Sequence, residues 1–131
     1  MNAKALIALA AVAMLLLGGC GEPGIQEIEL ALDKQGTAGD VVQTISPTDN
    51  PFHAVVHVNN GGGMKVKADL IAVDAGGEKN FVIASKELTL SGIENQMDVA
   101  FSLPTSWPPG KYKIDAYLDG KLGKSRQFDV K

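Results

Sequence analysis

The sequence predicts an all-β domain, a single antiparallel β-sandwich of seven to eight strands. Three observations predict this fold. From residue 25 onward, apolar and polar residues alternate in short runs, which is typical of strands that bury one face. Clusters of Gly, Pro, Asn and Asp separate the runs at the spacing of sandwich strands. No helical pattern lies between the runs, which disfavours a parallel sheet with crossover helices.

Each run is an expected strand, bounded by residues that favour turns. The first run is followed by a polar loop at residues 33–40, and the run at 81–90 changes phase midway. That phase change predicts a β-bulge near Ser85 or Lys86, because an extra residue reverses which side chains face inward. The expected strands cover residues 25–32, 41–45 (a short edge strand), 52–59, 64–73, 81–90, 96–103, 111–118 and 121–130.

The last two expected strands are joined by Asp119-Gly120. This dipeptide predicts a two-residue type I′ turn, because both positions of that turn require positive φ. Gly123, shortly after the turn, predicts a bulge in the final strand. The chain therefore ends in a β-hairpin.

Residues 1–19 are predicted to be a signal peptide rather than part of the sandwich. Lys4 gives the start a positive charge, and residues 5–17 carry no polar side chain. This apolar run is shorter than the roughly 20 helical residues that span a bilayer core. It matches the apolar region of about 7–15 residues in secretory signals.

The signal ends in Leu17, Gly18, Gly19 and Cys20, which resemble a bacterial lipobox. Cys20 is the only cysteine, so no disulfide can form within the chain. The resemblance implies a diacylglyceryl group on the Cys20 sulfur, cleavage before Cys20, and a further acyl group such as palmitate on the new amine. The expected anchor is thus covalent lipid, with no other cofactor.

Cleavage before Cys20 would leave a chain of 112 residues with a formal charge of −4. This acidity disfavours nucleic acid as a partner, since nucleic-acid binding requires a basic surface. Residues 20–24 are expected to form a short tether before a domain at 25–131. The four residues after Cys20 reach at most about 14 Å when fully extended. The lipobox resemblance also implies the sorting rule of enterobacterial lipoproteins, in which Asp after the lipidated cysteine retains the protein in the inner membrane, and here that position is Gly21. The expected location is therefore the outer membrane, facing the periplasm.

The C-terminal segment SWPPGKYKIDAYLDGK resembles the end of an immunoglobulin-like or fibronectin-III-like sandwich. In such folds a tyrosine after a Pro-Gly turn hydrogen-bonds upstream backbone as a tyrosine corner, and Tyr112 occupies that position. Together with FHAVV and KVKADLIAVDAGGEKN, most of residues 44–130 resembles a recurrent domain of uncharacterised bacterial lipoproteins. This resemblance implies a fold and an exported location, and it implies no activity.

Trp107, Pro108 and Pro109 form the one loop whose composition suggests recognition. A tryptophan on a proline-stiffened loop can dock a partner protein or stack on a sugar. The same residue can instead cover the open end of a sandwich core. Both interpretations remain open at the level of sequence.

No constellation of residues predicts catalysis or metal binding. His53 and His57 share one strand face but lie about 13 Å apart there, too far for a single ion, and both are expected to face solvent. The sequence thus predicts a non-enzymatic, lipid-anchored interaction or structural module of the cell envelope. Its expected partner is an envelope protein or glycan near the membrane. The alternative is an envelope enzyme inhibitor, or a binder of solutes or glycans, that uses the Trp107 loop.

Overall fold

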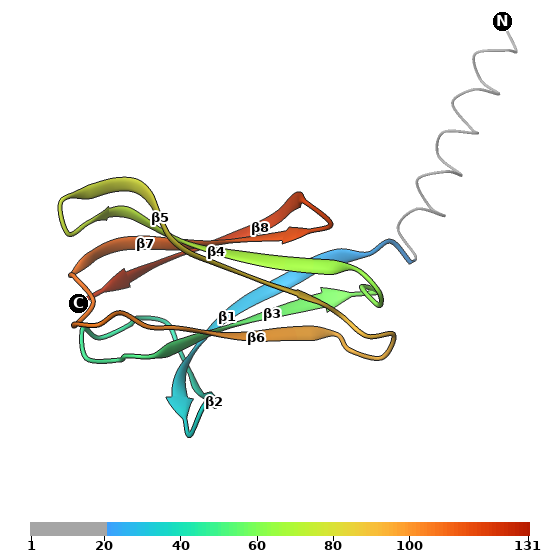
Figure 1. Ribbon diagram of the computed structural model, residues 1–131, viewed down its shortest axis with the longest axis horizontal. Coiled ribbons are helices and arrows are strands. Elements are labelled where there is room, and N and C mark those ends of the chain that lie inside the picture. The colour runs from blue at the N-terminus through green and yellow to red at the C-terminus, as the bar shows by residue number, and fades with distance from the viewer. Residues whose placement is uncertain (1–20) are drawn as a thin grey trace, which may run out of the picture.

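The computed structural model describes residues 21–131, and every element in this range is a strand (Figure 1). The predicted signal peptide and Cys20 lie outside the described residues. Within the described range no helix is long and apolar enough to cross a membrane. The eight strands are β1 (Gly24–Lys34), β2 (Thr37–Val42), β3 (Phe52–Asn59), β4 (Lys65–Ala75), β5 (Glu78–Thr89), β6 (Gln96–Phe101), β7 (Gly110–Leu118) and β8 (Lys121–Val130).

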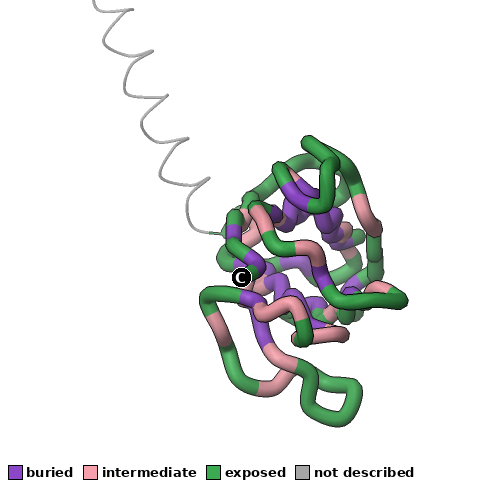
Figure 2. The backbone as a smooth tube through the Cα atoms, turned by 90° about the vertical axis from the view of Figure 1, so that its left-hand side faces the viewer, coloured by how far each residue is buried: buried purple, intermediate pink, exposed green. Residues whose placement is uncertain are grey.

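The strands form two antiparallel four-stranded sheets packed face to face. The first sheet has the order β2-β1-β3-β6 and the second the order β5-β4-β7-β8. The prediction of an all-β antiparallel sandwich is confirmed. Alternating residues of the central strands supply the core between the sheets, and Figure 2 shows the buried segments gathered there while the turns are exposed. The largest fully buried side chains include Trp107, Tyr112, Phe52 and Phe101.

The β1–β2 hairpin replaces the polar loop that the sequence predicts at residues 33–40. β1 continues further than expected and turns at Gln35 and Gly36, which have φ values of 53° and 89°. Gln-Gly is not among the preferred dipeptides of such turns, so the sequence pattern hides the hairpin. Ile45, expected at the end of an edge strand, is fully buried and forms an isolated parallel bridge with Val130.

Two predicted bulges can be located from the strand register. The bulge of β5 lies at Ile83, earlier than the predicted Ser85 or Lys86. Val82 and Ala84 pair with two consecutive residues of β4, and Ile83 between them has no partner. The bulge predicted at Gly123 is confirmed by the pairing of β7 with β8. The β7–β8 turn also has the predicted positive φ at both central residues, 49° and 84°.

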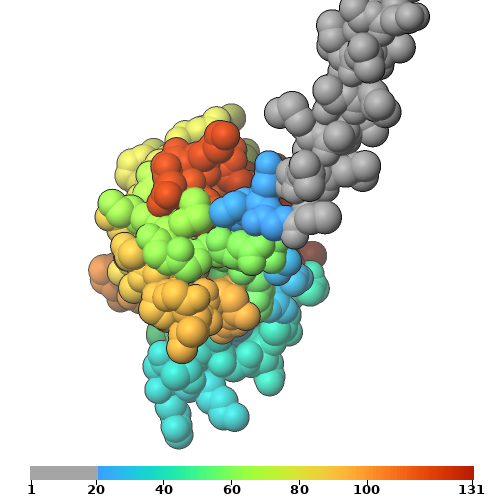
Figure 3. All heavy atoms as spheres, turned by 90° about the vertical axis from the view of Figure 1, so that its right-hand side faces the viewer, coloured from blue at the N-terminus to red at the C-terminus, as the bar shows by residue number. Residues whose placement is uncertain are grey.

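The described chain starts at one end of the sandwich, beside three turns. The Gly21 carbonyl accepts a hydrogen bond of 3.0 Å from the Asn60 side chain in the β3–β4 turn. The β3–β4 turn also contacts the start of the β5–β6 connection, because the Gly63 amide donates a hydrogen bond of 2.8 Å to the Leu90 carbonyl. Figure 3 shows this end, with the first residues, the two turns and the β7–β8 turn on one face. We call it the N-terminal end.

Candidate functional site

The outer face of the β2-β1-β3-β6 sheet carries both histidines of the chain. Phe52 and alternate residues of β3 point into the core, so His53, Val55 and His57 point outward. The expectation that both histidines face solvent is wrong for His53, which is 1% exposed. Its side chain is covered although it lies on an outer sheet face.

The β1–β2 hairpin covers His53 by bending across the outer face of its own sheet. β2 and β6 lie at opposite edges of that sheet. Even so, the amide of Ala38 in β2 donates a hydrogen bond of 3.0 Å to Asp98 Oδ2 in β6. This contact requires the hairpin to arch over β3. The hairpin thus forms a flap, and His53 lies beneath it.

His53 is held between two carboxylates from the neighbouring strands. Its Nε2 lies 2.7 Å from Asp33 Oδ1, and its Nδ1 lies 2.7 Å from Asp98 Oδ1. An ionised carboxylate only accepts hydrogen bonds, so with both aspartates charged each ring nitrogen carries a proton. The geometry therefore matches an imidazolium ion between two acceptors. We call this group the Asp33–His53–Asp98 clamp.

The pKa values of the clamp follow from this arrangement. Burial acts to lower the pKa of His53, but the hydrogen bonds and charges of Asp33 and Asp98 outweigh it and raise the pKa above its usual 6.5. The hydrogen bond from His53 lowers the pKa of Asp33 below its usual 3.8. Both shifts favour the charged forms. The clamp therefore ties β1, β3 and β6 together by charge-assisted hydrogen bonds.

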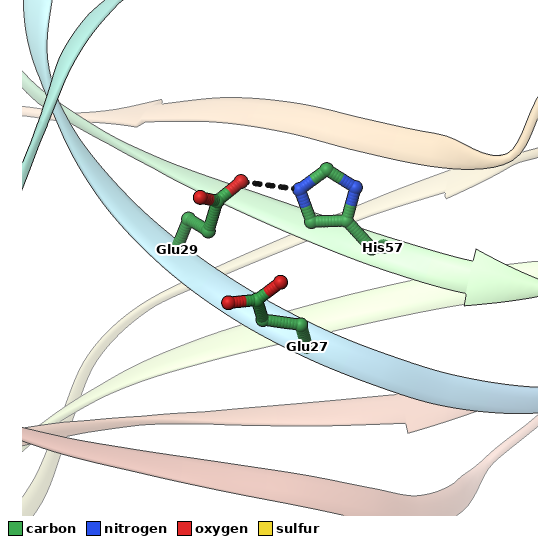
Figure 4. A group of neighbouring side chains, drawn as sticks. All are labelled: Glu27, Glu29 and His57. Atoms are coloured by element: carbon green, nitrogen blue, oxygen red, sulfur yellow. Dashed lines mark hydrogen bonds and ion pairs between the residues drawn. The ribbon is translucent and has the colours of Figure 1, made fainter.

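A second group lies further along the same face, nearer the N-terminal end. Glu27 and His57 are direct cross-strand partners of β1 and β3, and Glu29 follows on the same face. His57 Nε2 lies 2.5 Å from Glu29 Oε1. One potential ligand atom from each of the three side chains lies within 4.8 Å of the other two. Figure 4 shows the two carboxylates and the imidazole converging above the strands.

The outer face of the other sheet carries a carboxylate pair of a different kind. Asp69 of β4 and Asp115 of β7 are cross-strand partners and are 8% and 6% exposed. Each accepts a hydrogen bond from a serine, and lysines lie 3.8 Å from Asp69 and 3.5 Å from Asp115. These carboxylates are compensated by lysines and serines of their own sheet. They therefore form an ion-paired surface and not an open ligand set.

Trp107 does not offer its ring to a partner. The indole is 1% exposed, lies 4.9 Å from the Phe52 ring between centroids, and donates from Nε1 to the Asp49 carbonyl at 2.9 Å. Of the two interpretations of this loop, the structure therefore matches the cap over the core, and the contact role of Trp107 is corrected. Pro109 is exposed, and Pro108 is partly covered.

Pro108 lines a shallow apolar depression of about 180 Å³ with Phe81, Ile83 and Leu103. This volume is smaller than the roughly 300–1,000 Å³ of typical ligand pockets. The Tyr112 hydroxyl donates a hydrogen bond of 2.6 Å to the Pro108 carbonyl, four residues upstream. This is the bond of a tyrosine corner. Tyr112 and Trp107 therefore serve the packing of this end of the sandwich.

The sequence analysis missed the clamp because its members are far apart along the chain. Asp33 lies 20 residues before His53, and Asp98 lies 45 residues after it. The only local signal is a pair of histidines at outward positions of a mostly apolar strand. The group formed by Glu27, Glu29 and His57 carried a similar signal, since alternation places both glutamates on one strand face.

No protein-family model matches the chain, and its sequence has no significant match among curated proteins. Similar solved structures exist. An immunoglobulin-like protein of Pseudomonas aeruginosa aligns with a TM-score of 0.52 at 14% identity, over 85% of this chain and 98% of that one. The alkylpurine DNA glycosylase AlkC of Pseudomonas fluorescens, bound to DNA with an abasic-site analogue, aligns with a TM-score of 0.52 at 11% identity.

The two similarities differ in extent. The alignment with the glycosylase covers 85% of this chain but only 31% of the glycosylase, so this chain spans about a third of that protein. The alignment with the immunoglobulin-like protein covers the same 85% of this chain but 98% of the other protein. At these identities the similarity concerns the fold. The chain folds as an immunoglobulin-like β-sandwich.

Proposed function

We propose that this chain is a lipid-anchored envelope protein whose immunoglobulin-like domain acts as a non-catalytic interaction or structural module at the membrane surface. The fold supports the module by analogy only, because an immunoglobulin-like sandwich is a rigid scaffold that can position loops for binding. The lipobox-like Leu17-Gly18-Gly19-Cys20 supports the anchor, and Gly21 after it favours the outer membrane, facing the periplasm. The proposed partner is an envelope protein or a glycan, and the acidic charge disfavours nucleic acid.

One hydrogen bond supports a position of the domain close to the membrane. The hydrogen bond between Gly21 and Asn60 attaches the chain to the β3–β4 turn one residue after Cys20. Consecutive Cα atoms are about 3.8 Å apart. A lipid on Cys20 would therefore hold the N-terminal end of the sandwich against the headgroups, with almost no free tether.

One exposed residue of that end fits contact with a bilayer. Ile93, in the β5–β6 turn, is 96% exposed. Gly92 beside it lies against Gly62 of the β3–β4 turn, which is the turn that binds Gly21. An isoleucine so placed would enter the interface between headgroups and acyl chains, where its burial is favourable. The opposite end, with the Trp107 loop and the flap, would then face away from the membrane and toward a partner.

The anchor is tested by expressing the full chain in a bacterial host that is fed an alkyne analogue of palmitate. The wild-type protein should carry the label and sediment with membranes. The Cys20→Ala variant should lose both, because it has no sulfur to receive the lipid. A Cys20→Ala variant that still sediments with membranes would refute the anchor.

The orientation is tested separately in the lipidated protein. A polarity-sensitive fluorophore is attached to Ile93→Cys and, as the matched control, to Thr105→Cys in the exposed loop at the opposite end. In vesicles carrying brominated lipids, the probe at position 93 should be quenched and the probe at 105 should not. Equal quenching at both positions would contradict the orientation while leaving the anchor intact.

An inhibitor or ligand-binding role centred on Trp107 is not favoured by the geometry. The indole itself is buried, so Trp107 offers no surface to a partner, although its neighbours Thr105, Ser106 and Pro109 are exposed. Enzymatic activity is likewise not part of the proposal. The glycosylase that shares this fold is about three times as long, so its DNA chemistry is not transferred to this chain.

A further inference from the structure

Glu27, Glu29 and His57 form the group of potential ligand residues found in the described part of the chain, and their charge is only partly compensated. Among the described residues, Glu29 pairs with His57, whereas no ion pair joins Glu27 to a basic side chain. Lys124 and Arg126 approach β1 from β8, but they donate to the backbone carbonyls of Gln26 and Ile28 at 2.9 Å. Two neighbouring carboxylates therefore lie beside one histidine, which pairs with Glu29 only, and neither has a lysine or arginine partner within ion-pair distance.

The position of the three side chains is set by the backbone. A register shift between Ile25 and Glu27 in β1 places Glu27 directly opposite His57. Glu29 follows two residues later on the same face of β1, and Figure 4 shows the Glu27 carboxylate beside the bonded Glu29 and His57 side chains. Cross-strand partners have Cβ atoms about 4.5–5.5 Å apart, which suits ligation of one small ion. The donors are thus gathered by rigid strands and not by a loop.

We propose that Glu27, Glu29 and His57 bind a divalent transition-metal ion of the zinc type. Tetrahedral zinc, with bonds of about 2.0–2.2 Å, requires ligand atoms about 3.3 Å apart. The three donors already lie within 4.8 Å of one another. Glu29 Oε1 and His57 Nε2 are now hydrogen-bonded at 2.5 Å, so an ion must replace that bond and the two atoms must separate to about 3.3 Å. Glu27 is exposed, so its side chain has room to turn toward them. The site is independent of the proposed lipid anchor.

The ligand types select the class of ion. One imidazole nitrogen with two carboxylate oxygens suits zinc, copper or nickel, whereas calcium and magnesium prefer sites made wholly of oxygen. Three protein ligands leave one position of a tetrahedral ion for water. Glu29 and His57 are partly buried, and their side chains are 27% and 29% exposed, so water competes only in part for the ion.

His53, in contrast, cannot serve as a ligand. Both its nitrogens are occupied by Asp33 and Asp98, and it lies beneath the flap. The two histidines on one strand therefore have separate roles. This difference also makes the experiment selective, since zinc should involve only one of the two imidazoles.

The test is calorimetric titration of the full chain, tag-free and in detergent, with zinc chloride, and with magnesium chloride as the comparison ion. Zinc should bind with a stoichiometry of one in the micromolar range, and magnesium should give no heat. His57→Ala should abolish this binding, and Glu27→Gln should weaken it by at least about tenfold, as loss of a metal-supporting residue does. Glu87→Gln removes the same charge from exposed β5 and should bind as the wild type does.

Folding of each variant is checked by the fluorescence of Trp107 and by its urea midpoint. NMR of the imidazole groups provides a second readout, in which zinc should shift the His57 signals and leave those of His53 in place. Absence of zinc binding in the micromolar range by the folded wild type would overturn the proposal. Zinc binding that survives both His57→Ala and Glu27→Gln would also overturn it, because the ion would then be held elsewhere.

Discussion

The buried Asp33–His53–Asp98 clamp makes a specific prediction about stability. His53→Ala removes an imidazolium that is 1% exposed and donates to two carboxylates at 2.7 Å each. A hydrogen bond to a charged group contributes about 1.5–3 kcal/mol. The two aspartate side chains are 28% and 32% exposed, so water partly replaces the lost partner. We therefore expect the free energy of unfolding to fall by about 3 kcal/mol, at the low end for a broken buried pair.

Urea unfolding followed by tryptophan fluorescence measures this loss. Trp107 is the only tryptophan and is buried in the core, so its emission reports global unfolding. With a urea slope of about 2 kcal/mol per molar, the midpoint should fall by about 1.5 M. His57→Ala is the matched control, because it removes a histidine from the same strand face that is 29% exposed and makes one bond. Its loss should stay below about 1 kcal/mol.

The clamp also predicts how stability depends on pH. The pKa of His53 is raised in the folded state, so its contribution is complete below 6.5, the usual value, and is lost as pH rises through the folded pKa. The pKa of Asp33 is lowered, so its contribution is present above 3.8 and is lost as pH falls through the folded pKa. The clamp should therefore stabilise the wild type most between these two values.

Measurements at a series of pH values above 6.5 complete the test. The wild type should lose stability as pH rises, and His53→Ala should lack that part of the pH dependence. The chain has only two histidines, so the imidazole NMR signals can be assigned by comparison with His57→Ala. A His53→Ala variant within about 1 kcal/mol of the wild type, or the same pH profile in both proteins, would refute the reasoning.

Two further predictions concern the end of the sandwich around the tyrosine corner. Tyr112→Phe removes the bond from the hydroxyl to the Pro108 carbonyl and should lower the free energy of unfolding by about 1–2 kcal/mol. Tyr117→Phe is the control, because the ring keeps its contact with Lys67, and it should change the free energy of unfolding little. Equal losses of stability for the two variants in urea unfolding would contradict the role of the corner. Gly110→Ala should cost about 3 kcal/mol, since a Cβ there would lie 2.4 Å from the Asp74 carbonyl oxygen at a φ of 151°. Gly120→Ala should cost only about 1 kcal/mol, because a Cβ there would meet no atom within 4 Å. A urea midpoint as low as that of Gly110→Ala would count against the steric argument.

Sequence patterns and the structure agree best where the determinants are local. Alternation located most strands because a strand that buries one face must place apolar residues at every second position. The Asp119-Gly120 turn and the Gly123 bulge followed from backbone preferences of single residues. The β1–β2 hairpin escaped detection because Gln35 occupies a positive-φ position that side chains seldom adopt.

The sequence by itself determined the fold class, the positions of most turns and the prediction of a lipidated Cys20, since each depends on residues close together in the chain. Only the tertiary structure decided which outer surfaces are covered. His53 is buried because a flap from β2 reaches across to Asp98 in β6, and no local pattern encodes that contact. The role of Trp107 was decided in the same way, by the aromatic rings that meet it from other strands. Alternation specifies which side chains leave the plane of a sheet, whereas the chain topology determines what they meet there.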